Sequence, residues 1–155
     1  KQVIVGALPD MITFSPDGTK VMTANEGQPN LDYSIDPEGS VSIIDISGGL
    51  ESLTQNKVKT LLFTAFNENE VALIKSGIRK TNAGSTLSQD LEPEFITIAA
   101  NSKKAWVTLQ ENNAIAEINR ITINKKLLFN FVFKVDIGLK FKFINVVFRF
   151  YLCGC

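Results

Sequence analysis

The stretch LPDMITFSPDGTKVMTANEG, residues 8–27, decides the fold class because two short apolar runs flank a strong turn. Ser15-Pro16-Asp17-Gly18 places proline and glycine at the positions that a tight turn favours. The runs over 11–14 and 20–24 on either side therefore predict a β-hairpin. The alternating stretch SVSIIDIS, residues 40–47, predicts a third strand.

The same order of elements returns about 84 residues further along the chain. A strand is predicted over 96–98, a turn at Asn101-Ser102, and further strands over 105–109 and 114–119. Strand, tight turn, strand, polar loop and strand is the outline of one blade of a β-propeller. In this alignment Glu111 occupies the place that Glu26 has in the first repeat.

The connection between the repeats has a pattern of its own. Residues 58–63 can supply an outer strand for the first unit. Asn67, with Glu70 three residues on, has the pattern of a helix N-cap, so a short helix is predicted over 68–76. The polar and small residues over 80–89 predict a loop.

These elements predict an all-β protein, an incomplete β-propeller fragment with one short helix in the connection. Residues 1–123 form the partial propeller, with blade-like antiparallel units over 9–63 and 93–120. Two units cannot close a ring, because propellers have at least four blades. We therefore expect the chain to be a piece of a longer protein.

The last segment, residues 124–155, differs in kind. It contains seven of the 11 phenylalanines and no Ala, Ser, Thr, Glu, Gln or Pro. Its alternation allows a β-rich hairpin. Its residue types are those of A/T-rich codons, however, so we favour a non-native tail produced by translation of non-coding sequence.

Charge and composition exclude several function classes. Residues 1–123 carry 10 Lys and Arg against 15 Asp and Glu, and an acidic body argues against nucleic acid as a partner. The chain has no histidine, which removes the commonest general base and the Ser-His-Asp triad. Cysteine occurs only at positions 153 and 155, which is too few for a structural zinc site. The tail is too short and too charged for a transmembrane helix.

Five motifs occur in order over residues 2–120: ALPD, ANEG, DPEGSVSIID, DLEPE and LQENNA. In this order they resemble the choice-of-anchor I domain family, which includes mesenchyme-specific cell-surface glycoproteins and secreted bacterial relatives labelled alkaline phosphatase. The chain also looks like the broader YVTN-type propellers. The resemblance implies an extracellular or cell-surface propeller that acts as a binding or adhesion module for a protein or glycan ligand. Its alternative implication is a metal-dependent phosphoesterase.

Acidic loop residues are the candidate site. The candidate metal ligands are Glu26, Asp36, Glu38, Asp90, Glu92, Glu94 and Glu111. Carboxylates are hard oxygen ligands, and Ca²⁺ takes six to eight oxygens. We expect Glu92 and Glu94 to lie beside Glu26 and Glu111 and to share a Ca²⁺ ion. The alternative is a set of solvated loops. A phosphoesterase would rest on metal-bound water, since no histidine is present, so the enzymatic interpretation is the less favoured.

Overall fold

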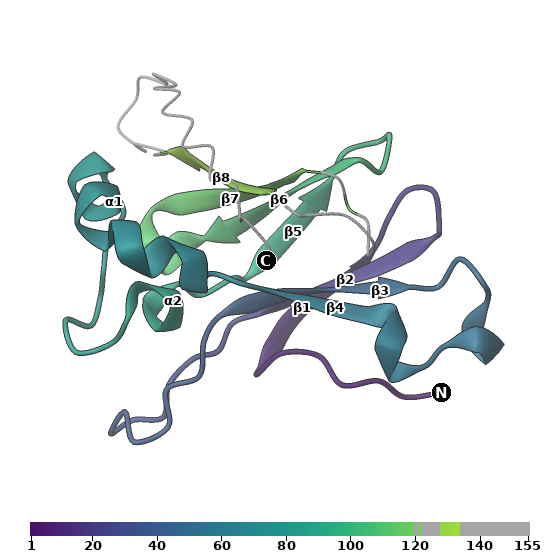
Figure 1. The fold of residues 1–155 in the computed structure, drawn as a ribbon, viewed down its shortest axis with the longest axis horizontal. Helices are drawn as coiled ribbons and strands as arrows, with labels where there is room; N and C mark the ends of the chain where they lie inside the picture. Colours follow the sequence, from purple (N-terminus) through teal and green to yellow (C-terminus); the bar gives the residue numbers. More distant parts are fainter. Residues whose placement is uncertain (120, 122–127, 134–155) are drawn as a thin grey trace.

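The computed structural model describes residues 1–119, 121 and 128–133, which form two four-stranded antiparallel sheets stacked on each other (Figure 1). The first sheet contains, in spatial order, β1 (Pro9–Phe14), β2 (Lys20–Asn25), β3 (Ser40–Asp45) and β4 (Val58–Leu62). The second contains β5 (Phe95–Ile98), β6 (Lys104–Leu109), β7 (Ala114–Asn119) and β8 (Leu128–Phe133). The predicted all-β class and its two antiparallel units are confirmed.

Both predicted hairpins are present, and their turns fix the repeat distance. In the first turn the Gly18 amide donates to the Ser15 carbonyl at 2.8 Å. In the second turn the Ser102 amide donates to the Ala99 carbonyl, also at 2.8 Å. Ser15 and Ala99 are 84 residues apart, as are Gly18 and Ser102. With this register the counterpart of Glu26 is Gln110, so its predicted equivalence with Glu111 is wrong by one residue.

The core lies between the two sheets. The first sheet contributes buried side chains that include Met22, Ala24, Val41 and Ile43. The second contributes Ile96, Val107, Ala116 and Ile118. Each large apolar side chain buried in this way stabilises the fold by about 1.5–3 kcal/mol. The sheets therefore form one packed body, with a shared core.

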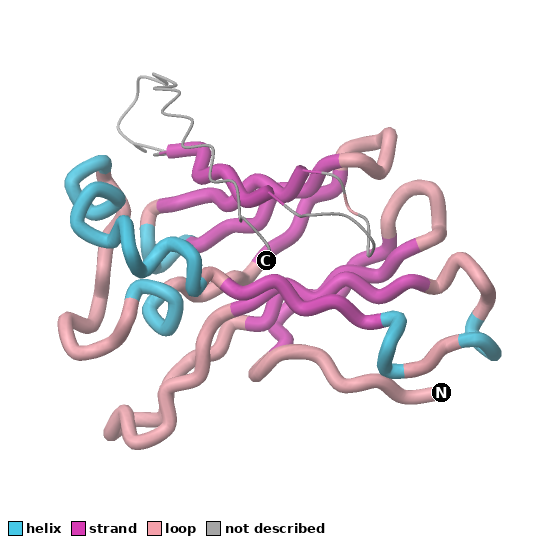
Figure 2. Tube along the Cα trace, viewed as in Figure 1, coloured by secondary structure: helices cyan, strands magenta, loops and turns pink. Residues whose placement is uncertain are grey.

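The connection carries helices at both ends of the sheets, drawn in cyan (Figure 2). The 3₁₀ helices η1 (Leu50–Ser52) and η2 (Gln55–Lys57) precede β4, and η3 (Thr64–Asn69) follows it. The helix α1 (Glu70–Ser76) begins two residues after the predicted start and ends at Gly77, whose φ of 119° suits glycine. The predicted N-cap is wrong, because Asn67 bonds Ser88 instead, accepting from its amide at 2.8 Å.

A second short helix, α2 (Leu87–Asp90), occupies part of the segment predicted as loop. Thr86 and Gln89 form a capping box at its start, in which the Thr86 side chain accepts from the Gln89 amide. The T-x-x-Q spacing is a recognised start signal for a helix. The last 3₁₀ turn, η4 (Gln110–Asn112), joins β6 to β7.

The strand β8 falls inside the segment that the sequence assigns to the tail. Its backbone pairs with β7, with Phe131 opposite Ala116. The origin of the tail stays a prediction, and residues 122–127 and 134–155 lie outside the described part of the chain. No helix among the described residues has the length and apolar character needed to span a membrane.

Candidate functional site

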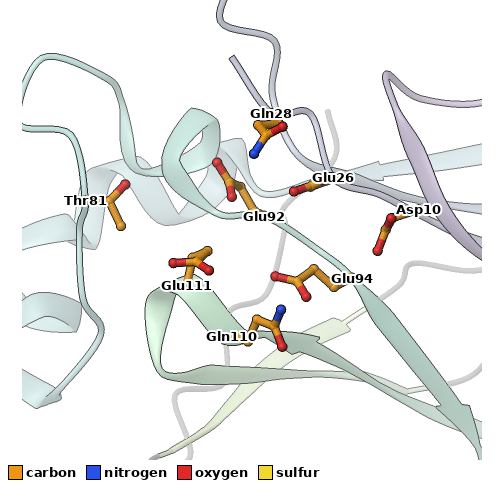
Figure 3. Close-up of a pocket in the computed structure, with 8 residues that line it drawn as sticks. All are labelled: Asp10, Glu26, Gln28, Thr81, Glu92, Glu94, Gln110 and Glu111. Atoms are coloured by element: carbon orange, nitrogen blue, oxygen red, sulfur yellow. The ribbon is translucent and has the colours of Figure 1, made fainter. Parts of the chain in front are cut away.

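An acidic pocket of about 320 Å³ opens where β1 and β5 begin and β2 and β6 end (Figure 3). Its lining consists of Asp10, Glu26, Gln28, Thr81, Glu92, Glu94, Gln110 and Glu111. Five of these eight side chains are carboxylates and two are amides, so oxygen atoms dominate the surface. The antiparallel pairing of β1 with β2 and of β5 with β6 places all these strand ends at one rim.

Backbone hydrogen bonds hold the carboxylates at this rim. The Glu26 amide donates to the Leu8 carbonyl at 2.8 Å, which places Glu26 beside the start of β1. The Glu94 amide donates to the Thr108 carbonyl at 3.1 Å, which places Glu94 at the start of β5. Pro93 fixes its own φ and disfavours a helical conformation at Glu92, and residues 91–94 form no helix.

A very close backbone approach positions this segment against the first sheet. A Cβ atom on Gly39 would lie 1.9 Å from the Leu91 carbonyl oxygen, so only glycine fits there. The Gly39 amide also donates to the Ser88 carbonyl at 3.2 Å. The motif DPEGSVSIID, which contains Gly39, therefore packs directly against the motif DLEPE, which contains Leu91.

Asp90 is a candidate that does not line the pocket. It is 4% exposed and accepts hydrogen bonds from the Thr81 amide and hydroxyl and from the Asn82 amide. The fully buried Asn112 donates to the Asp90 carbonyl at 2.7 Å and to its carboxylate at 3.0 Å. Asn112 also accepts from the Glu92 amide at 3.2 Å. Asp90 and Asn112 thus form a buried polar hub that holds the residues lining the pocket.

Asp36 and Glu38 lie outside the pocket as well. Asp36 accepts a hydrogen bond from the Ser85 hydroxyl, and its carbonyl accepts from the Gln89 side chain at 2.8 Å. Glu38 accepts from the Ser88 hydroxyl at 2.7 Å. These contacts attach the loop before β3 to α2. The structure therefore brings together four of the seven candidates, namely Glu26, Glu92, Glu94 and Glu111.

The crowding of carboxylates changes their acidity. Burial, and then the charges of Glu26 and Glu111, raise the pKa of Glu92 to about 7. Burial also raises the pKa of Glu94, with Glu26 and Glu111 adding to the effect. The pKa of Glu26 is raised by burial and by the charges of Asp10 and Glu111. The pocket is thus a place where negative charge is poorly compensated.

One cation partly offsets this charge. Arg79 contacts the Glu111 carboxylate at 3.2 Å, with both side chains about half exposed. Among the described residues, no other Lys or Arg forms an ion pair with a carboxylate of the pocket. No three acidic or thiol side chains of the described part converge closely enough to hold a metal ion as they stand. The carboxylates surround a shared space rather than one point (Figure 3).

The sequence could have indicated Asp10 as a further member of the pocket. Pro9-Asp10 in the first repeat corresponds to Pro93-Glu94 in the second at the same spacing of 84 residues. Both carboxylates then lie where the first strand of their sheet begins, at the same rim. Gln28 and Thr81 come from loops, and no pattern in the sequence indicates that they meet the glutamates.

Comparison with known proteins gives one match. The family model for the choice-of-anchor I domain matches residues 1–129, which includes both sheets up to the start of β8. No curated protein and no solved structure matches the chain.

Proposed function

The chain therefore belongs to the choice-of-anchor I domain family, and from this membership we propose a surface-associated binding module whose ligand site is the acidic pocket, with Ca²⁺ as its cation. The family identifies a surface-associated protein. The pocket supports the finer part of the proposal, since it is where five carboxylates face one space. We propose an extracellular protein or glycan as the ligand that the module binds.

The observation that carries the calcium proposal is the raised pKa of Glu92 together with its four acidic neighbours. Two like charges 4 Å apart repel by about 1 kcal/mol in water and by about 4 kcal/mol near a protein surface. A divalent cation would convert this repulsion into attraction. Carboxylate and amide oxygens are the ligands that Ca²⁺ prefers.

The geometry also favours Ca²⁺ over Mg²⁺. Mg²⁺ demands near-ideal octahedral geometry, whereas Ca²⁺ accepts six to eight oxygens in flexible arrangements. Glutamate side chains are long enough to move inward around a larger ion. Because this rearrangement costs free energy, we expect an affinity in the range of extracellular modules, with a Kd of about 10⁻⁴–10⁻³ M.

Calorimetric titration of the chain with Ca²⁺, with Mg²⁺ as the comparison ion, tests the proposal. At ten times the Kd, Ca²⁺ should stabilise the fold by about 1.4 kcal/mol and raise the Tm by roughly 3–6 °C. The double variant Glu92→Gln, Glu94→Gln should lose both the heat of binding and the rise in Tm. The matched control is Glu51→Gln, an exposed carboxylate in η1. Absence of Ca²⁺ binding by the unmodified chain, or an unchanged response of the double variant, would refute the proposal.

A further inference from the structure

Glu111 is the carboxylate whose charge reaches the other glutamates of the acidic pocket. Burial raises the pKa of three glutamates that line the pocket, and the charge of Glu111 adds to each of these increases. The three residues are Glu26, Glu92 and Glu94. A positive charge beside Glu111 therefore acts on the pocket as a whole.

Arg79 supplies this positive charge from the connection between the two sheets. Its Nη2 atom lies 3.2 Å from Oε2 of Glu111. Its Nε atom donates a hydrogen bond to the main-chain carbonyl of the same residue. The guanidinium group thus contacts Glu111 at two points, and the second contact does not involve the carboxylate.

A buried residue fixes the main chain of Arg79 in this position. The Arg79 amide donates to the Asn112 carbonyl at 2.9 Å, and the Asn112 side chain donates to the Arg79 carbonyl at 3.1 Å. Asn112 is fully buried, whereas the side chains of Arg79 and Glu111 are about half exposed. The main chain is therefore anchored, while the ion pair lies at the surface, where its carboxylate can exchange partners.

This ion pair occupies a carboxylate that a cation in the pocket would use. Glu111 lines the pocket together with Glu92 and Glu94. Since Ca²⁺ lies about 2.3–2.6 Å from its oxygen ligands, an ion on Oε2 of Glu111 would lie within about 6 Å of Arg79 Nη2. The bond from Nε to the carbonyl does not depend on the carboxylate, so it keeps the guanidinium group close enough to repel the ion.

We propose that Arg79 is a built-in counter-ion, which competes with an incoming cation for Glu111 and so weakens the affinity of the pocket for cations. This inference rests on the proposed function, in which the pocket binds Ca²⁺. For a single and a double positive charge about 6 Å apart in water, Coulomb's law gives roughly a tenfold effect on the Kd. Salt reduces this effect, because the screening length falls from about 30 Å at 0.01 M to about 8 Å at 0.15 M.

Calorimetric titration of the unmodified chain and three variants with Ca²⁺ tests the proposal. Arg79→Gln removes the charge, and it should lower the Kd about three- to tenfold at 0.01 M salt and by less at 0.15 M. Arg79→Lys keeps the charge but lacks the fork that contacts both the carboxylate and the carbonyl, so its Kd should be intermediate. Lys103→Gln is the matched control, since it removes an exposed positive charge in the turn between β5 and β6, at the other end of β6 from the pocket.

Circular dichroism checks that the variants are folded, as expected for the loss of an exposed ion pair. A second titration uses hexaamminecobalt(III), whose ammonia ligands prevent direct coordination, so it responds to the charge of the pocket without a calcium site. The proposal is overturned if Arg79→Gln binds either ion with an unchanged or higher Kd, or if Lys103→Gln has an equal effect. If Ca²⁺ binds neither protein but Arg79→Gln binds the cobalt complex more tightly, the calcium function fails and the role of Arg79 stands.

Discussion

The change Glu92→Gln should stabilise the protein at alkaline pH and have little effect at acidic pH. Its pKa in the folded state is about 7, raised from 4.5 by burial and by the neighbouring carboxylates. The folded state therefore holds this proton more tightly than the unfolded state does. The free energy of unfolding falls as the pH rises from 4.5 to 7, because the unfolded chain ionises this carboxyl freely in that range while the folded chain keeps it protonated. Glutamine cannot ionise, so the variant escapes this loss.

The size of the effect follows from the shift. One pKa unit corresponds to 1.36 kcal/mol, so a shift from 4.5 to about 7 would give about 3 kcal/mol at full effect. Glu92 is only partly buried, and solvent screening reduces such contributions. We therefore expect the variant to be about 1–2 kcal/mol more stable than the unmodified chain at pH 8, with the difference close to zero at pH 4.5.

Urea denaturation of both proteins at pH 4.5 and pH 8, without divalent cations, measures this difference. The control is Glu51→Gln, in which the lost carboxylate is exposed in η1. If the Glu92→Gln variant is less stable than the unmodified chain at pH 8, or if the difference in stability does not change with pH, the acidic pocket does not disfavour ionisation of Glu92. The charge argument for a cation would then lose its basis.

Three further substitutions test the supports of the pocket by the same denaturation assay. Asn112→Ala should cost about 2–3 kcal/mol, because it removes the donor that holds Asp90; a loss below 1 kcal/mol would contradict the hub. Thr86→Ala should cost about 1 kcal/mol by removing the cap of α2, and an unchanged urea midpoint would argue against that cap. Gly39→Ala should lower the free energy of unfolding by more than the approximately 1 kcal/mol of a typical substitution, because its Cβ would collide with the Leu91 carbonyl. An unchanged stability would show that the backbone at Leu91 can move away at little cost.

Much of the fold could be predicted because its signals are local. Turn chemistry at Ser15–Gly18 and the alternation of apolar residues identify the hairpins without any knowledge of distant contacts. The capping box of α2 was equally local, and the loop prediction over 80–89 missed it because glycine and polar residues dominate that stretch. The sequence paired Glu26 with Glu111 because the two residue types match. The hydrogen bonds of the two turns set a spacing of 84 residues, which pairs Glu26 with Gln110 instead.

The candidate site was harder to predict because it depends on long-range packing. Glu26 and Glu92 could be placed at one rim from strand order alone. The position of Asp90 outside the pocket could not be predicted in this way, because it depends on hydrogen bonds from Asn112 and from Thr81. Asp36 and Glu38 were also attached elsewhere by serine hydroxyls. A carboxylate in a loop can either line a pocket or hold two loops together by hydrogen bonds. Only the contacts in the folded chain distinguish these two roles.

The close approach of Gly39 to Leu91 also has a consequence for how the chain folds. Each sheet can form from contacts between neighbouring strands, which are fast because short loops close at little entropic cost. Docking the sheets is different, since the contact between Glu38 and Ser88 spans 50 residues. The search for this contact should therefore limit the folding rate. A side chain at position 39 would obstruct that late step, so a nascent chain with such a change would spend longer with both apolar faces uncovered.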